Sequence, residues 1–449
     1  MSQRVLFVAY AYPPTGGAGV QRTAKFVKYL PRCGWTPSVL TVANPSVPVI
    51  DESLNADVSN GALVRRARTL EPGYALKAAI SSGQNGAAKN GGARRLAKRM
   101  AWQLSRVLLQ PDPQVLWLPG AIREGERLLK KLAHAAIVAT APPFSSLLIG
   151  ATLSRRTGLP LVLDYRDEWD LSSAYSENRR ADPFSRWLQG AMQRQVVRRA
   201  GALVATTRSS AEALERIRRA GGGRARVTWI YNGYDPDDFP EEAQPASKSD
   251  RYRVAYVGTL WNLTSIEPLV KAIRLLGERY PDLCGRLELV VAGRRTPPQQ
   301  AVLEQLRNTP CRLIEHPYID HHQAVELMRS ADDLCVILAD VPGAERVVPA
   351  KIFESMATRR PVLVIAPRGE LWDIVADYPS GRTFAPADVE GICRELAAKI
   401  SKRRSDTATP PVEWEAARYD RRHQAQQLAD LLSWLVGSKC SKPYDPSAC

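Results

Sequence analysis

The sequence predicts an α/β protein built from two parallel-sheet domains. Short β-branched and apolar runs alternate with helical stretches along the 449-residue chain, a pattern typical of parallel sheets covered by helices. The runs are 5–9, 38–42, 136–139, 161–164 and 202–205, then 253–257, 287–292, 334–338 and 362–365. The two series are separated by residues 232–250, whose Pro, Gly, Asp and Ser content is typical of a linker between domains.

Chain length supports this division, since 449 residues exceed what one hydrophobic core usually organises. We place the first domain at 1–235 and the second at 236–411. Apolar residues recur at approximately helical spacing over 412–436, which predicts a closing helix, and residues 437–449 form a tail without periodicity. The sequence therefore predicts two domains of ordinary size, a helix and a short tail.

Composition excludes several classes of protein. Hydrophobic residues make up 45% and charged residues 24% of the chain, as in globular proteins, and no stretch approaches the run of about 20 apolar residues that crosses a bilayer. The N-terminus has the pattern of a first strand and not of a secretory signal, so we expect a cytoplasmic location. Seven cysteines are scattered without Cys-x-x-Cys spacing, which indicates neither a zinc site nor a disulfide framework. We expect no metal or other cofactor.

The formal net charge of +16 is concentrated between residues 65 and 108, where ten Lys and Arg residues accompany one Glu. Within this basic insertion, residues 94–108 place apolar side chains at helical spacing, which predicts a basic amphipathic helix. Such a helix can pack on the core with a solvated basic face, or dock on an anionic membrane surface at the inner face of the membrane. Nucleic acid is not an expected partner, because no recognised binding module accompanies the charge.

A glycine-rich turn follows the first strand. Residues Pro13–Gly19 lead into a helix that begins near Val20, and such a turn lets backbone N–H groups approach an anion at the helix N-terminus. Gly16 and Gly17 are the candidate contacts. The alternative is a tight turn that needs glycine only for its geometry.

Acidic residues follow the run at 161–163. Asp164–Asp170 contains four carboxylates and one Arg at the carboxyl edge of the predicted sheet, where open α/β sheets place their sites. Asp164 and Asp167 are the candidate site residues, with helix capping or surface solvation as the alternative. Thr140–Ser146 occupies the equivalent edge of the preceding strand, so the two loops should converge on one cleft.

In the second half, two strands end in glycine turns, Gly258-Thr259 and Gly293-Arg294-Arg295, which are plausible phosphate or base contacts. The stretch Pro349–Ala357 then predicts a helix that feeds a buried strand. Lys351 and Glu354 lie three residues apart and therefore share one face of that helix. Either they form an ordinary surface ion pair, or Lys351 binds a diphosphate while Glu354 accepts hydrogen bonds from ribose hydroxyls.

Taken together, these motifs resemble family 4 glycosyltransferases, which are retaining, metal-independent nucleotide-sugar enzymes of the GT-B fold. The resemblance covers nearly the whole chain, and it is strongest to members that build bacterial surface polysaccharides and lipopolysaccharide or decorate cell-envelope and secondary-metabolite acceptors. The motifs occur in the family's order: 13–17, 164–169, 232–235, 258–259 and 349–357. The fold implied is two Rossmann-like domains that face each other across a cleft.

The resemblance implies a donor site. Gly16 and Gly17 would face the donor diphosphate, and Glu354 would bind the ribose. The remaining donor contacts lie in the second domain: Gly258, Thr259, Arg294, Arg295 and Lys351. Lys351 or one of the two arginines would neutralise the leaving phosphate. UDP is the first expectation for the nucleotide and GDP the second.

The resemblance also implies catalytic residues. Asp164 and Asp167 would orient hydroxyls of a glycan, lipid-linked or small-molecule acceptor, and Glu345 would lie near the transferred sugar. Two departures from the family pattern stand out. Glu345 and Glu354 enclose eight residues where the family commonly has seven, and the Arg and Lys that often follow the second-domain glycine turn are missing from 258–264.

The predicted function is retaining transfer of a sugar from a nucleotide-sugar donor. One alternative is a non-catalytic scaffold of the same fold, or a peripheral-membrane binding protein. A nicotinamide oxidoreductase is disfavoured, because the glycine turn lacks Gly-x-Gly-x-x-Gly spacing and the second α/β series is complete. A nucleic-acid-binding protein is the remaining alternative.

Overall fold

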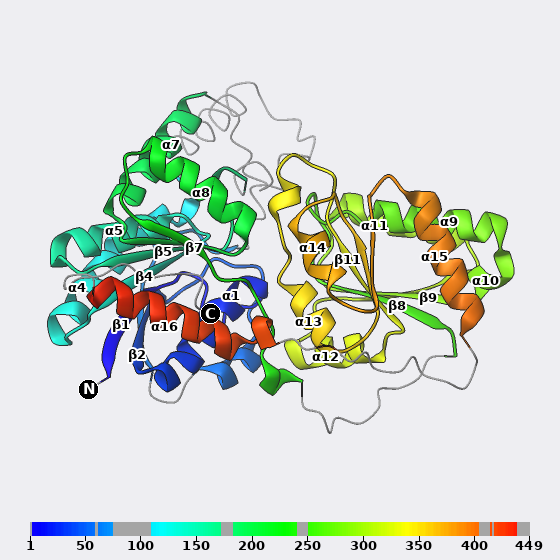
Figure 1. Cartoon of the computed structure of the whole chain (residues 1–449), viewed down its shortest axis with the longest axis horizontal. Coiled ribbons are helices and arrows are strands. Elements are labelled where there is room, and N and C mark those ends of the chain that lie inside the picture. Colours follow the sequence, from blue (N-terminus) through cyan, green and yellow to red (C-terminus); the bar gives the residue numbers. More distant parts are fainter. Residues whose placement is uncertain are drawn as a thin grey trace, which may run out of the picture. The chain divides into compact units, whose positions relative to one another are not determined.

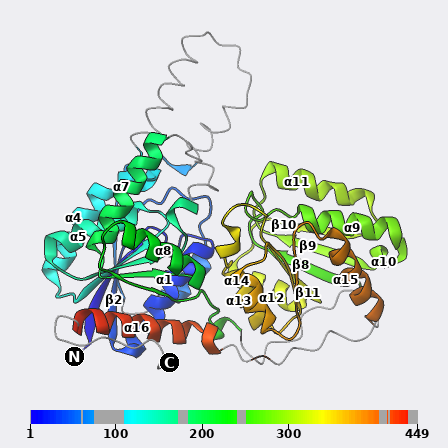
Figure 2. The same ribbon diagram turned by 45° about the horizontal axis from the view of Figure 1, so that its top comes forward.

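The computed structural model describes residues 2–58, 62–74, 109–171, 183–239, 250–403, 414 and 417–437 (Figures 1 and 2). Residues 75–108, which include the predicted basic helix at 94–108, and the tail beyond residue 437 lie outside these ranges. The chain divides into a first unit, Met1–Ile230 with Ala425–Cys449, and a second unit, Tyr231–Gln424. Within the described ranges, no helix combines the length and the apolarity needed to span a bilayer.

The first unit contains a seven-stranded parallel sheet of order β3-β2-β1-β4-β5-β6-β7. Its strands are β1 (Gln3–Val8), β2 (Trp35–Val42), β3 (Leu63–Ala67), β4 (Ala136–Ala141), β5 (Leu161–Tyr165), β6 (Ala202–Ala205) and β7 (Arg226–Trp229). Strands β4, β5 and β6 are buried along their whole length, which explains why their residues are apolar except for Thr140 and Asp164 near the carboxyl ends. The strand order reverses between β1 and β4, the position at which doubly wound sheets bind ligands.

Helices cover both faces of this sheet (Figure 1). In β1, Val5 and Phe7 point to one face and Leu6 and Val8 to the other. The first face packs against α1 (Ala18–Tyr29) and α16 (Arg421–Gly437), and the second against α4 (Leu118–Lys131), α5 (Ser145–Thr157), α7 (Pro183–Arg199) and α8 (Arg208–Ala220). Helix α16 covers most of the stretch predicted as the closing helix, and its apolar residues join the core of the first unit.

The second unit repeats this plan with a six-stranded parallel sheet of order β10-β9-β8-β11-β12-β13. Its strands are β8 (Tyr252–Val257), β9 (Leu287–Ala292), β10 (Arg312–His316), β11 (Asp333–Ile337), β12 (Val362–Ile365) and β13 (Gly381–Phe384). One face packs against α9 (Glu267–Arg279), α10 (Pro281–Gly285), α11 (Pro297–Glu304) and α15 (Val389–Lys402), and the other against α12 (His321–Ser330), α13 (Lys351–Ala357) and α14 (Glu370–Ala376).

All nine predicted strands are present, whereas four further strands were missed: β3, β7, β10 and β13. These four are the outer strands of the two sheets. Each is only partly buried and carries Arg among its residues, so it lacks the continuous apolar run of a central strand. Arg65 and Arg66, which begin the basic insertion in the sequence, lie in the outer strand β3.

Candidate functional site

Asp164 lies at the carboxyl end of β5 in a buried ion pair. Its Oδ1 accepts hydrogen bonds from Nη2 of Arg22 at 2.9 Å and from Nε at 3.1 Å, and its Oδ2 accepts one from Oγ1 of Thr140 at 2.9 Å. Arg22 is 1% exposed and Asp164 is 4% exposed. Nη1 of Arg22 also donates to the carbonyl of Ile230 at 2.9 Å. The pair therefore joins helix α1 to β4, β5 and the end of β7, and Arg22 is a partner that the sequence did not reveal.

Two neighbouring residues of this motif are hydrogen-bonded to β4 and α8. Nε of Arg166 donates to the carbonyl of Ala141 at 3.3 Å, and Oε1 of Glu168 accepts from Oγ of Ser210 at 2.7 Å. Asp167 is exposed, and its carboxylate has no hydrogen bond or ion pair with any residue that the structure describes. Asp167 thus remains available to solvent and ligands.

The loops 140–146 and 164–170 meet, as the sequence predicted. Besides the contacts of Asp164 and Arg166, the ring of Trp169 stacks on Phe144 with centroids 4.6 Å apart and planes inclined by 19°. Trp169 also donates from Nε1 to Oε1 of Gln189 on α7 at 3.2 Å. The ring stacking and the hydrogen bond from Arg166 to Ala141 therefore join the two loops at one edge of the sheet in the first unit.

The glycine turn lies beside the same edge. Gly17 is the N-cap of α1 with φ of 100°, and no side chain caps this helix. The N–H of Gly16 donates to the carbonyl of Val49 at 3.0 Å. A Cβ at Gly19 would lie 3.0 Å from Nη1 of Arg166. The fold therefore brings the glycine turn and the acidic motif together, although they are far apart in sequence.

In the second unit, Lys351 lies at the carboxyl end of β8. Its Nζ donates to the hydroxyl of Tyr256 at 2.7 Å and to the carbonyl of Val257 at 3.4 Å, and it lies 3.9 Å from the centroid of the Tyr256 ring. A Cβ at Gly258 would lie 2.9 Å from this Nζ. The structure thus places the predicted lysine against the predicted glycine turn and adds Tyr256, which the sequence did not identify, as the residue that positions it.

The glycine turns after β8 and β9 pack on each other. A Cβ at Gly293, whose φ is 129°, would lie 2.2 Å from the carbonyl oxygen of Gly258. The N–H of Leu260 donates to the carbonyl of Arg294 at 2.8 Å, and the carbonyl of Thr259 accepts from the hydroxyl of Tyr256 at 3.0 Å. These bonds form a compact backbone layer beside the Lys351 ammonium.

We expect Gly293→Ala to destabilise the second unit by about 2–4 kcal/mol, because the new methyl group meets a backbone oxygen and alanine is strained at positive φ. Gly158→Ala is the matched control, since Gly158 has φ of 74° with nothing within 4 Å of an added Cβ, and should cost only about 1 kcal/mol. Urea unfolding of both variants measures the difference. If the two variants lose the same free energy of unfolding, the close contact between the two turns does not make Gly293 more sensitive to substitution.

The two arginines after β9 differ in their surroundings. The guanidinium of Arg295 donates from Nη1 to the carbonyl of His316 at 3.0 Å and from Nε to Oε1 of Gln300 at 3.0 Å, and it lies 3.6 Å from Glu315. Its hydrogen bonds hold the end of β9 to the end of β10. Arg294, by contrast, has an exposed side chain.

The two candidate glutamates also differ. Glu354 lies in the first turn of α13 and is partly buried. Glu345 lies in a short 3₁₀ turn, Ala344–Arg346, with its side chain 47% exposed and its Oε1 3.2 Å from Nη1 of Arg346. Among the described residues, no group of three or more His, Cys, Asp and Glu side chains could hold a metal ion.

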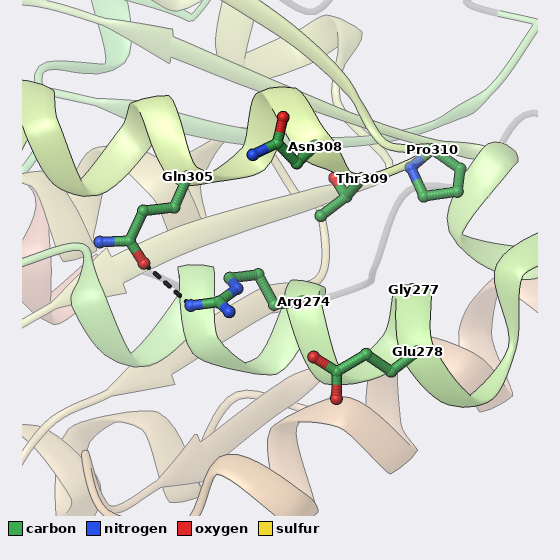
Figure 3. A pocket seen from close by; sticks show the side chains of 7 residues that line it. All are labelled: Arg274, Gly277, Glu278, Gln305, Asn308, Thr309 and Pro310. Carbon is green, nitrogen blue, oxygen red and sulfur yellow. Dashed lines mark hydrogen bonds between the residues drawn. The ribbon is translucent and has the colours of Figure 1, made fainter.

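A pocket of about 360 Å³ lies elsewhere in the second unit (Figure 3). Arg274, Gly277 and Glu278 line it from the C-terminal half of α9, and the remaining lining residues, Gln305, Asn308, Thr309 and Pro310, precede β10. A helix that follows a parallel strand runs back toward the start of the sheet. The pocket is therefore at the amino edge of the strands, opposite Lys351 and the glycine turns.

Comparison with known families and structures agrees with the predicted fold. The model of the glycosyl transferase 4-like domain matches residues 16–233, and that of glycosyl transferases group 1 matches residues 251–402. The fold is similar to HepE of Anabaena in complex with UDP and glucose, at 16% identity over 96% of this chain and 99% of HepE, with a TM-score of 0.56. No curated protein matches the chain by sequence.

Two further solved structures share the fold. WaaG, a glycosyltransferase involved in lipopolysaccharide biosynthesis, is 16% identical over 97% of this chain and 98% of WaaG, with a TM-score of 0.53. AviGT4, a glycosyltransferase involved in avilamycin A biosynthesis, is 12% identical over 97% of this chain and 98% of AviGT4, with a TM-score of 0.51. The predicted class, two parallel-sheet α/β domains, is confirmed.

Proposed function

Because the chain belongs to the glycosyltransferases, with a 4-like domain followed by a group 1 domain in a GT-B fold, we propose that it transfers a sugar from a nucleotide-sugar donor with retention at the anomeric carbon. The observation that carries this proposal is the position of Lys351, whose ammonium lies 2.7 Å from the Tyr256 hydroxyl beside the turn at Gly258. A fixed cation beside a glycine turn suits a diphosphate, which needs both charge and close backbone approach.

The nucleotide would be bound by the second unit. Glu354, one turn along α13 from Lys351, would accept hydrogen bonds from the ribose hydroxyls. The exposed side chain of Arg294 would supply a second cation, whereas Arg295 would hold the ends of β9 and β10. A uridine nucleotide is the first choice of donor, supported by the UDP-glucose complex of HepE, and GDP is the second.

Transfer of this kind requires little acid–base chemistry from the protein. The bond between the anomeric carbon and the diphosphate oxygen breaks, the acceptor hydroxyl oxygen forms the new bond to the same face, and the leaving diphosphate takes the hydroxyl proton. Lys351 would stabilise the charge that develops on the leaving group. Because this interaction strengthens toward the transition state, Lys351 should contribute to kcat more than to ground-state binding.

The acceptor would be a glycan, a lipid-linked sugar or a small molecule. WaaG and AviGT4 act in lipopolysaccharide and avilamycin A biosynthesis, which supports this range of acceptors. Asp167, exposed and without a hydrogen bond or salt bridge to any described residue, would orient an acceptor hydroxyl. Glu345 would lie near the transferred sugar. The basic sequence at 94–108 would hold the enzyme on the inner face of a membrane, which a liposome co-sedimentation assay tests.

The proposed function is tested first by thermal shift with UDP, GDP, ADP and dTDP. A stabilising nucleotide identifies the donor class, since a ligand that binds only the folded protein raises its melting temperature. Release of the free nucleoside diphosphate from the matching nucleotide sugars then measures turnover. No shift with any nucleotide, together with no release, would indicate a non-catalytic scaffold.

We expect Glu354→Gln to weaken binding of the identified nucleoside diphosphate about 10-fold, because a charged acceptor of ribose hydrogen bonds is replaced by a neutral one. The control is Glu326→Gln on α12, where the side chain is 67% exposed. Isothermal titration calorimetry measures both variants. If the wild type and Glu354→Gln bind the nucleoside diphosphate with equal affinity, Glu354 does not bind the ribose.

A further inference from the structure

The guanidinium of Arg166 is fixed in place but incompletely paired. Its Nε donates to the carbonyl of Ala141 at 3.3 Å, its Nη2 donates to the carbonyl of Pro142, and the carbonyl of Arg166 accepts from Oγ1 of Thr206 at 3.0 Å. Its Nη1 is buried and has no hydrogen-bond partner among the described residues. Buried donors are nearly always hydrogen-bonded, so an unpaired guanidinium nitrogen at a sheet edge requires an explanation.

This nitrogen faces the N-terminus of helix α1. A Cβ at Gly19 would lie 3.0 Å from Nη1 and 3.7 Å from the central guanidinium carbon. Gly17 and Gly19 are both exposed, and no side chain caps the helix. The exposed backbone at Gly17 and Gly19 is flanked by Arg166. An anion bound over Gly17–Gly19 would therefore lie next to the guanidinium.

Positive charge from helix α1 and from Arg166 meets at this position. The N-terminus of a 12-residue helix carries a partial positive charge, and the guanidinium lies against it. Burial lowers the pKa of Arg166 below its usual value, although Asp167 and Asp164 oppose this effect. The Asp164 carboxylate is engaged by Arg22, and Arg166 forms no ion pair with any residue in the described ranges. A bound anion would give Arg166 the ion pair that it lacks among the described residues.

We propose that Arg166 and the first turn of α1 together hold a phosphate group of a substrate. This inference rests on the proposed function, in which two substrates can supply phosphate: the donor diphosphate, or an acceptor that itself carries phosphate. A phosphate has enough acceptor oxygens to receive the helix amides and a guanidinium N–H at once. Arg166 is the residue of the 164–170 motif that this inference adds to the substrate-binding set.

Glycine at position 19 lets the guanidinium lie this close to the helix. A Cβ there would lie 3.0 Å from Nη1, so the guanidinium would have to move by a few tenths of an ångström. Gly19→Ala therefore tests the position of the charge without removing the charge, whereas Arg166→Met removes the charge. Arg166→Lys keeps the charge but loses the planar fork that reaches two carbonyls and an anion together.

The experiment measures binding of UDP, inorganic pyrophosphate and farnesyl diphosphate to the full chain by isothermal titration calorimetry, with uridine and farnesol as the probes without phosphate. We expect Arg166→Met to weaken at least one phosphate-bearing probe by about 10-fold or more and to leave uridine and farnesol unchanged. Arg166→Lys and Gly19→Ala should weaken the same probe by smaller factors. A pyrophosphate titration in the Lys351→Met background separates this site from the second unit.

The affected probe identifies the source of the phosphate. Weakened UDP binding assigns the site to the donor, and weakened farnesyl diphosphate binding with unchanged UDP binding assigns it to a phosphorylated acceptor. Arg199→Met is the matched control, since Nη2 of Arg199 also donates to a backbone carbonyl, that of Ser154 at 2.7 Å. If this control weakens the same probe equally, the effect is one of net charge and the inference is wrong.

Failure of this inference differs from failure of the proposed function. If the wild type binds UDP and releases it from a nucleotide sugar, but Arg166→Met, Arg166→Lys and Gly19→Ala bind every phosphate-bearing probe as the wild type does, Arg166 has no phosphate ligand. If the wild type binds no nucleotide, the proposed function fails. Should Arg166→Met not fold, Gly19→Ala and Arg166→Lys still decide the matter.

Discussion

Replacing Asp164 with alanine is expected to destabilise the first unit by about 3–5 kcal/mol, because it leaves the Arg22 guanidinium buried without its counter-ion. The salt bridge has an N–O distance of 2.9 Å, with the two side chains 1% and 5% exposed. Urea unfolding followed by circular dichroism measures the loss. An exposed pair in the same unit, Arg208 and Glu212 on α8 with 70% and 61% exposed side chains, provides the control, and Glu212→Ala should cost less than about 0.5 kcal/mol.

A double-mutant cycle isolates the pair from its surroundings. Arg22→Met and Asp164→Leu should each be strongly destabilising, while the double variant should cost less than the two single changes together, since it leaves no buried charge unpaired. Additive costs would show that the two side chains do not interact energetically. The predicted role of Asp164 in orienting the acceptor can be measured separately from its effect on stability. If Asp164 has that role, Asp164→Asn lowers kcat at a temperature where the variant is fully folded.

Replacing Lys351 with methionine is expected to lower kcat/KM by about 10²–10³-fold, the usual effect of removing one group that stabilises transition-state charge. Binding of the nucleoside diphosphate should weaken less, because the interaction strengthens as the leaving group gains charge. Steady-state kinetics with the donor identified by thermal shift, together with calorimetry of the product nucleotide, measure the two effects on the same variant.

Tyr256→Phe is the control for the position of Lys351. It removes the hydroxyl that accepts from Nζ at 2.7 Å and keeps the ammonium and the aromatic ring. Activity should fall by a smaller factor than in Lys351→Met if Tyr256 only positions the lysine. If Lys351→Met turns over the donor with unchanged kcat/KM, Lys351 is not the cation that stabilises the leaving diphosphate. Arg294 would then be the next residue to replace.

The central strands could be predicted from the sequence and the outer strands could not, for one physical reason. A central strand of a doubly wound sheet is covered on both faces, so β6 and β12 are continuous apolar runs. An outer strand has one neighbour and partial burial. Strands β3, with sequence LVRRA, and β10, with RLIEH, therefore carry charge and lose the period that reveals a strand.

The segments that form the candidate site could also be predicted from the sequence. Glycine turns after β1 and β8 and polar residues after β5 were identified because a chain that leaves a buried strand needs either a tight turn or a soluble loop. Lys351 and Glu354 share a helix face through their spacing alone. The resemblance to a glycosyltransferase family arose from the same segments, and the family models match the chain over both units.

Which side chains meet depends on the three-dimensional fold. Arg22 and Asp164 are 142 residues apart, and Lys351 and Tyr256 are 95 apart, so no local pattern indicates either contact. These contacts depend on strand order, which places β1 beside β4 and β8 beside β11. Helical and strand periods are properties of neighbours in sequence, whereas the pairing of a buried charge is a property of neighbours in space. Asp164 illustrates this difference. The sequence predicts it as a site residue, and only the fold shows its buried ion pair with Arg22.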